Sequence, residues 1–280
     1  MADIKAGWVQ VPNGALQIDT YLAEPITEEI VPGVIVKLIV IYFFQTDPLT
    51  ARVSSPILCN LNADQLIQEI FGVNAHIQDV TERLAREGYR AIRETIPTGI
   101  APAIFQRTAP GFEVGYTMDE TILGRKHKDL TTADQLLSDI QATINYLKAM
   151  PTVKKTGFGA IGFCFGGHVA YLAATLADIQ ATASFYGAGI ATLTPGGGNT
   201  TITRTADIQG TLYAFFGEQD PLIPNEQTEQ IAAALQAHNI SHQVFCYPAG
   251  HGFFCDRRPD YNAQAASESW NQVRQLFKHL

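Results

Sequence analysis

Short apolar runs alternate with helical patterns along most of the chain, from about Val34 onward. Alternation of this kind predicts a parallel sheet, because two parallel strands need a long crossover connection that is usually a helix. Runs that are almost entirely apolar, such as Gly157–Phe163 and Ala181–Tyr186, indicate strands covered on both sides. The sequence therefore predicts an α/β fold, with a mostly parallel central sheet and helices on both faces.

Turn and cap signals mark the bounds of the expected elements. Trp8–Leu22 predicts two strands around the turn signal Pro12-Asn13-Gly14. The Gly/Thr-rich stretch 192–205 predicts a flexible surface connection, with a binding lid as the alternative. Helices are expected at 74–86, 131–150, 168–177, 224–238 and 260–280, and further strands at 212–216 and 243–247.

Length and composition limit the class of protein. No internal repeat or long linker divides the 280 residues, so we expect a single domain over 1–280. A net charge of -8 repels phosphate backbones and argues against a nucleic-acid partner. The longest apolar run, 34–44, contains Lys37 and is shorter than the ~20 residues that a membrane span needs. Without a signal-peptide pattern, we expect four reduced cysteines and a cytoplasmic location.

A candidate nucleophile lies in the segment Gly162-Phe163-Cys164-Phe165-Gly166-Gly167, between an apolar strand and a helix. A tight strand–turn–helix needs small residues on both sides of its central residue, whose side chain it projects above the sheet. The following helix N-terminus favours a thiolate. The alternative interpretation is a buried structural cysteine in a glycine-rich turn.

Two further residues follow strands later in the chain. Asp220 comes after the run 212–216, and His251 lies between two glycines after the run 243–247. Each has an ordinary alternative, a turn aspartate before proline and a surface loop histidine. Nucleophile, acid and histidine in this order are typical of α/β-hydrolases, so the three residues together predict a Cys-Asp-His triad.

A metal site is not expected. Cys246, His251 and Cys255 have loosely metal-like spacing, but no fourth ligand is apparent in the sequence. The other histidines are interpreted as structural or surface residues, with His168 facing the core. We therefore expect no cofactor.

Several segments resemble the dienelactone hydrolase family over most of the chain. The most specific is Gln68-Glu69-Ile70-Phe71-Gly72-Val73-Asn74, and the others are Arg107-Thr108-Ala109-Pro110-Gly111, the Cys164 turn, Gly217-Glu218-Gln219-Asp220 and Tyr247-Pro248-Ala249-Gly250-His251-Gly252-Phe253. This resemblance implies the α/β-hydrolase fold and a thiol hydrolase of small esters or lactones.

The resemblance also implies roles for individual residues. Glu69 would interact with Cys164 in the resting enzyme and help control its ionisation. The alternative for Glu69 is an exposed carboxylate before an apolar turn. The backbone N–H groups of Ile70 and Phe165 would form the oxyanion hole, and Arg107 would bind a substrate carboxylate. The alternative for Arg107 is a solvated loop arginine.

The sequence departs from the family at the second carboxylate-binding arginine. That arginine lies four residues after the histidine, where this chain has Cys255. Arg257 and Arg258 are the candidate replacements. The departure concerns the substrate more than the reaction.

Two insertions interrupt the resemblance, at 37–66 and at about 93–100. Both fall in apparent strand sequence, where insertions are seldom tolerated. The longer one is apolar and could form a replacement strand, an extra strand, a loop over the active site or a damaging insertion. We favour retention of the site.

Three functions remain open from the sequence. The first is a cysteine-dependent hydrolase of an ester or lactone, possibly anionic, through a thioester intermediate. The second is a general carboxylesterase or thioesterase of the same fold, and the third is a non-catalytic scaffold disabled by the insertions. The oligomeric state and the natural substrate are not encoded in any of these patterns.

Overall fold

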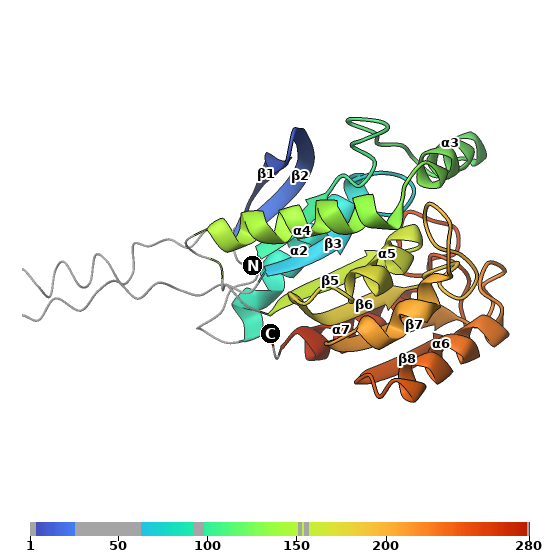
Figure 1. Ribbon diagram of the computed structural model, residues 1–280. Helices are drawn as coiled ribbons and strands as arrows, with labels where there is room; N and C mark the ends of the chain where they lie inside the picture. The colour runs from blue at the N-terminus through green and yellow to red at the C-terminus, as the bar shows by residue number, and fades with distance from the viewer. Residues whose placement is uncertain (1–3, 26–62, 92–97, 151–152, 154–156, 279) are drawn as a thin grey trace, which may run out of the picture.

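In the part of the chain that the structure describes, eight strands form one central sheet (Figure 1). The computed structural model describes residues 4–25, 63–91, 98–150, 153, 157–278 and 280. The strands are β1 (Ile4–Asn13), β2 (Leu16–Pro25), β3 (Ala63–Ile67), β4 (Thr98–Pro102), β5 (Phe158–Phe163), β6 (Ile179–Phe185), β7 (Thr211–Gly217) and β8 (His242–Tyr247). Their order in the sheet is β1-β2-β4-β3-β5-β6-β7-β8. The hairpin β1–β2 joins β4 in antiparallel fashion, and all pairs from β4 to β8 are parallel.

Helices cover both faces of this sheet (Figure 1). α4 (Ala133–Ala149) and α5 (Phe165–Ala173) pack on one face, while α2 (Ala75–Ala91) and α7 (Ala263–Phe277) pack on the other. α6 (Asn225–Ala237) lies against β8 and the 3₁₀ helix η1 (Thr201–Asp207). α3 (Met118–Asp129) lies at the rim. None of the described helices is both long enough and apolar enough to span a membrane.

The central strands are buried on both sides, as their apolar sequences predict. Every residue of β3 and β5 is buried. Because successive side chains of a strand point to opposite faces, Leu66 and Ile161 pack in the cluster that includes α2, whereas Ile67 and Ala160 pack in the cluster that includes α4. The predicted α/β architecture is confirmed.

The expected elements are found with shifted bounds. α5 begins at Phe165 rather than at His168, so it includes the two glycines of the turn. α3 was not expected, although Thr117 and Glu120 form a capping box at its start. The stretch 192–205 runs into η1 and is anchored by buried Thr201, which hydrogen-bonds His168 over 2.7 Å.

Both expected insertions fall partly outside the described residues. Residues 63–66, which the sequence assigned to the first insertion, form most of the core strand β3, and residues 98–100 of the second belong to β4. The apolar segments 34–36 and 38–44 lie in the range that the structure leaves undescribed. Ala63 pairs with Thr98, so β3 starts at the edge opposite the carboxyl ends of the parallel strands.

Candidate active site

Cys164 occupies the sharp turn between β5 and α5, with φ 54° and ψ -118°. A positive φ is rare for a side chain larger than glycine. The turn is tight enough that a Cβ at Gly162 would lie 1.9 Å from the carbonyl oxygen of Gly166. A Cβ at Gly166 would lie 2.2 Å from the carbonyl oxygen of Ile67. The glycines that flank Cys164 are therefore required by the close approach of backbone to backbone.

Cys164, His251 and Asp220 form a connected chain of side chains. His251 Nδ1 donates a hydrogen bond to Asp220 Oδ2 over 2.7 Å, and His251 Nε2 lies 3.1 Å from Cys164 Sγ. The second oxygen of Asp220 accepts the backbone N–H of Leu222 over 2.8 Å. His251 and Asp220 are buried and Cys164 is half-buried.

The loops that carry these residues meet because β5, β7 and β8 are parallel. Cys164 follows β5, Asp220 follows β7 and His251 follows β8, so all three lie at the same edge of the sheet. The backbone N–H of Gln219 donates to the carbonyl of Ala249 over 3.0 Å and ties the last two loops together. Binding sites of open α/β sheets form at this edge.

The surroundings of His251 hold a proton on its ring. Burial by itself lowers the pKa of His251, but the charge of Cys164 and the hydrogen bond to Asp220 outweigh burial and raise the pKa to about 10. An imidazolium beside the sulfur stabilises a thiolate, as does the N-terminus of α5. The arrangement therefore suits nucleophilic attack by sulfur.

The two amides expected to form an oxyanion hole lie on segments that touch. Phe165 is the first residue of α5, so its N–H has no partner within the helix. The segment leading to Ile70 packs on the next residue of α5, because a Cβ at Gly166 would also lie 2.4 Å from the carbonyl oxygen of Gln68. The joint role of the Ile70 and Phe165 amides stays a prediction.

Glu69 is paired with Arg258 and makes no hydrogen bond to Cys164, the residue with which the resemblance implied an interaction. Its buried carboxylate accepts a hydrogen bond from Arg258 Nη1 through Oε1 over 3.0 Å, while Cys164 Sγ lies against His251. The guanidinium of Arg258 attracts the Glu69 carboxylate more strongly than a neutral thiol would, because the ion pair is buried and poorly screened.

Of the two candidate arginines, Arg258 is the one that lies at the site. Its guanidinium packs on the backbone of Gly252, where a Cβ would lie 2.5 Å away, and lies 5.8 Å from the ring centroid of Phe71. Arg257 is exposed to solvent. Gly252 is next to His251, so Arg258 places a positive charge close to the triad.

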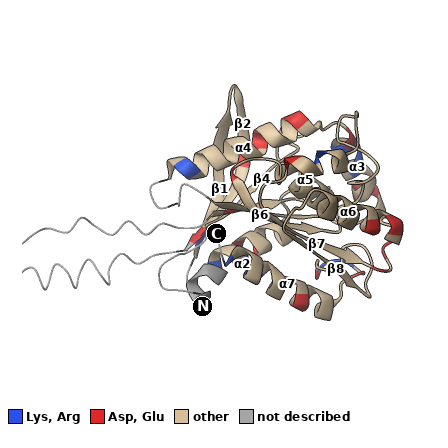
Figure 2. Cartoon of the chain, turned by 60° about the horizontal axis from the view of Figure 1, so that its bottom comes forward, with Lys and Arg blue, Asp and Glu red and all other residues tan. Residues whose placement is uncertain are grey.

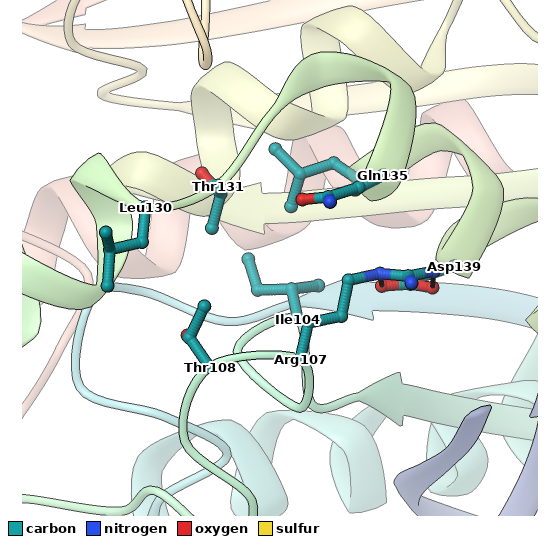
Figure 3. A pocket seen from close by; sticks show the side chains of 8 residues that line it. Ile104, Arg107, Thr108, Leu130, Thr131, Gln135 and Asp139 are labelled. Carbon is teal, nitrogen blue, oxygen red and sulfur yellow. Dashed lines mark hydrogen bonds and ion pairs between the residues drawn. The ribbon is translucent and has the colours of Figure 1, made fainter.

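Arg107 is paired with the buried carboxylate of Asp139 (Figure 3). Its Nη2 and Nε donate to the two carboxylate oxygens of Asp139 on α4, over 2.6 Å and 3.2 Å. Asn13 Nδ2 also donates to Asp139, over 2.7 Å. The guanidinium therefore ties the loop after β4 to α4, and its predicted contact with a substrate carboxylate stays untested.

The structure groups a different set of potential metal ligands from the one weighed in the sequence. Within the described part of the chain, Glu69, His76 and Cys255 bring ligand atoms within 4.8 Å of one another, whereas Cys246 is exposed on β8. Sequence reasoning missed His76, which was interpreted as an ordinary helix residue. It also missed Tyr186, a buried residue with φ 36° whose ring lies 5.2 Å from that of His251.

Comparisons with known proteins cover most of the chain. The model of the dienelactone hydrolase family matches residues 64–280. A Synechocystis protein with the provisional name carboxymethylenebutenolidase is 50% identical over 277 residues, covering 99% of this chain and 97% of its own length. A Yersinia pestis protein with the same provisional name is 31% identical over 214 residues, covering 76% of each chain.

Solved structures show the same fold. A provisionally named dienelactone hydrolase from Klebsiella pneumoniae superimposes with a TM-score of 0.77 at 22% identity, covering 99% of this chain and 100% of its own. A dienelactone hydrolase-like promiscuous phosphotriesterase from metagenomic libraries gives 0.69 at 21% identity, covering 100% and 99%. With the α/β-hydrolase fold and the family match together, the chain belongs to the dienelactone hydrolase family and is a hydrolase that acts on ester or lactone bonds.

Proposed function

We propose that Cys164 is the nucleophile of this hydrolase and that the reaction passes through a thioester. The observation that carries the proposal is the chain of contacts from Cys164 Sγ to His251 Nε2 over 3.1 Å and from His251 Nδ1 to Asp220 Oδ2 over 2.7 Å. A nucleophile, a base and a group that orients the base are the parts that covalent catalysis requires.

The proposed reaction has two steps. The thiolate of Cys164 adds to the ester carbonyl carbon, and the amides of Phe165 and Ile70 stabilise the oxyanion. The carbon–oxygen bond breaks, the leaving alkoxide or enolate takes the proton from His251, and a thioester remains. Neutral His251 then takes a proton from water, hydroxide adds to the thioester, and the carboxylic acid departs as the thiolate reforms.

Arg258 supports an anionic substrate. Its guanidinium packs on Gly252, the residue that follows His251, and the negative charges of Glu69 and Cys164 raise the pKa of Arg258. Lys and Arg also gather on α3 at the rim, at Arg125, Lys126 and Lys128 (Figure 2). A basic group of this kind attracts an anion toward the site.

A general carboxylesterase or thioesterase is the second candidate. The observation in its favour is that Arg107 and Arg258 are already paired with the carboxylates of Asp139 and Glu69. Comparing kcat/KM for an anionic ester and its neutral analogue separates the two. A preference for the anion that Arg258→Gln removes supports the first candidate, and equal rates support the second.

Trapping the intermediate tests the nucleophile. After mixing with an activated ester, intact mass spectrometry should find one acyl group on Cys164, and Cys164→Ala should lose both the adduct and turnover. Cys246→Ala is the matched control, since this thiol is exposed on β8. A folded protein that stays unacylated and inert toward activated esters would support the scaffold alternative.

We also infer a reducing, cytoplasmic location. The three cysteines that lie in described residues, Cys164, Cys246 and Cys255, are all unpaired thiols. Reduced thiols are the rule in that compartment.

A further inference from the structure

We propose that Glu69, His76 and Cys255 form a buried binding site for a thiophilic divalent transition metal such as Zn²⁺. The three ligand atoms lie within 4.8 Å of one another, and the three side chains are at most 1% exposed. The hydrolytic reaction proposed above uses no metal, so this site is an addition to it.

The residues come from three separate segments that meet beside the triad. Glu69 follows β3, His76 is in the first turn of α2, and Cys255 lies four residues after His251. A site assembled from distant segments exists only in the folded chain, so its ligands are held in place before an ion arrives.

Unpartnered polar atoms point to a ligand. Glu69 Oε2 and both ring nitrogens of His76 are buried without a hydrogen-bond partner among the described residues. Buried polar atoms are nearly always satisfied, and one ion would satisfy both Glu69 Oε2 and one ring nitrogen of His76. Desolvation lowers the pKa of His76, which keeps the imidazole neutral as a metal ligand must be.

The donor set selects the kind of metal. One thiol, one imidazole and one carboxylate are the ligand types of zinc and similar ions, whereas calcium and magnesium prefer oxygen alone. Tyr116 supplies a supporting contact, because its oxygen lies 3.4 Å from Cys255 Sγ and also accepts Asn74 Nδ2 over 3.1 Å. Its O–H is therefore positioned to donate to a metal-bound thiolate.

Arg258 is the group that opposes an ion. It uses Oε1 of Glu69 and leaves Oε2 for the metal, but its positive charge repels a dication. The carboxylate and the thiolate offset the two charges of the ion, so the repulsion by Arg258 weakens binding and does not prevent it. The surrounding rings of Phe163 and Phe254, 5.8 Å and 6.3 Å from the His76 ring centroid, exclude water.

The main competitor is the triad itself, since Cys164 and His251 also present a sulfur and a nitrogen. The test therefore uses the full reduced chain with Cys164→Ser, titrated with Co²⁺, whose bond to a thiolate absorbs in the near ultraviolet, and with Zn²⁺ in equilibrium dialysis. We expect one bound ion per chain and the thiolate band. Adding Cys255→Ala should remove the band and weaken binding at least about tenfold, the loss that metal-site changes typically produce.

Further variants fix the ligand set. In the Cys164→Ser background, His76→Asn and Glu69→Gln should weaken binding while the thiolate band remains, and Cys59→Ser and Cys246→Ser should change neither. X-ray absorption of the zinc-loaded Cys164→Ser protein should find one sulfur among lighter ligands, and it needs no further substitution if Cys255→Ala fails to fold.

Three results would overturn the site. They are no stoichiometric binding, a thiolate band that the parent protein shows but Cys164→Ser lacks, and a band that persists when Cys255→Ala is added to Cys164→Ser. None of these measurements uses a substrate. Failure of the metal site would therefore leave the proposed thioester mechanism standing, and failure of acylation at Cys164 would leave the metal site standing.

Discussion

At Cys164, the backbone conformation directs the side chain toward His251. The positive φ of 54° turns the side chain away from the sheet, and His251 Nε2 lies 3.1 Å from the sulfur. Strained positions of this kind persist only where the surrounding structure fixes them, here through Gly162 and Gly166. The local sequence was enough to predict this residue, because a tight strand–turn–helix needs those glycines.

The proton on His251 depends on its two neighbours. Burial lowers its pKa, and the charge of Cys164 followed by the hydrogen bond to Asp220 raises it to about 10. We predict that Cys164→Ser lowers the pKa of His251, because the largest raising contribution is lost. NMR titration of the imidazole measures the change, with exposed His238 as an internal reference. An unchanged midpoint in Cys164→Ser would contradict the prediction.

Glu69 shows where residue-level prediction failed. Family resemblance placed its carboxylate against Cys164, and the structure pairs it with Arg258, 189 residues away in sequence. Arg258 lies seven residues after His251, not four, so its role could not be assigned by counting along the chain. A loop places a side chain by its three-dimensional path, which a motif alone does not contain.

At the scale of elements, the turn between β5 and α5 depends on backbone contact with β3. Alanine normally stabilises a helix by about 1 kcal/mol relative to glycine. Gly166→Ala should do the opposite here and destabilise by about 1–3 kcal/mol, because the new Cβ would meet two backbone oxygens within 2.4 Å. Urea unfolding measures the effect. Gly7→Ala is the control, since no atom lies within 4 Å of its Cβ, and equal stability in the two variants would contradict the clash.

Strand β3 buries a carboxyl group, that of Asp64, whose pKa is raised well above its ordinary value. Burial raises the pKa of Asp64 from 3.8 to about 7. The hydrogen bond from the backbone of Gly159 lowers this pKa, but burial has the larger effect. A carboxyl whose pKa is higher in the folded state makes stability fall as pH rises from about 4 to about 7, and stability stays at that lower level above pH 7. The difference corresponds to at most about 4 kcal/mol.

Asp64→Asn removes this pH-dependent loss. We expect the variant to resemble the parent near pH 4 and to exceed its free energy of unfolding at pH 8, as measured by urea denaturation at both values. Asp129→Asn, at an exposed side chain, is the control that should show no such divergence. A gain of equal size at both pH values would argue against a raised pKa for Asp64.

The loop after β4 is tied to α4 by Arg107 and Asp139. Asp139 is 1% exposed, so removing Arg107 leaves a buried carboxylate with Asn13 as its remaining side-chain donor among the described residues. Arg107→Leu should destabilise by about 3–5 kcal/mol, and adding Asp139→Leu should recover much of the loss. Thermal or urea unfolding distinguishes the roles: a stable Arg107→Leu protein with a raised KM for anionic esters would show substrate binding instead.

Helices and strands were predicted correctly where their apolar residues follow a clear pattern. Buried strands such as β5 and β7 and the periodic helix α4 were found from apolar pattern alone. α3 was missed because its sequence, MDETILGRKHKD, shows little apolar periodicity and Gly124 interrupts it. That glycine is explained only by tertiary contact, since a Cβ would lie 2.3 Å from the carbonyl oxygen of Ile70.

For the whole molecule, the end of β2 and the start of β3, which border residues 26–62, lie at the sheet edge opposite the active site. β2 and β3 flank β4, and Ala23 and Ala63 pair near its first residues, Gly99 and Thr98. The end of β2 and the start of β3 therefore lie about 10 Å apart, two strand spacings, at the edge opposite Cys164. The family resemblance could not show this, because register is a property of the folded sheet.

This placement predicts that residues 37–62 are dispensable for hydrolysis. Deleting them leaves about eleven residues, 26–36, which span up to roughly 35 Å and easily bridge the gap of about 10 Å. A shorter connection also costs less closure entropy. We expect the deletion variant to keep the circular dichroism spectrum and the rate of acylation at Cys164 within about threefold, because the nearest described residues on either side, Pro25 and Ala63, lie at the sheet edge opposite the triad.

The matched control deletes residues 197–206, which include the anchor Thr201 and are joined to His168 one helical turn from Cys164. That variant should lose acylation, since the removed segment supports the helix that carries the nucleophile. If the 37–62 deletion instead stays folded and loses acylation, the segment must reach the active-site edge, and the substrate site would have to be redefined to include it.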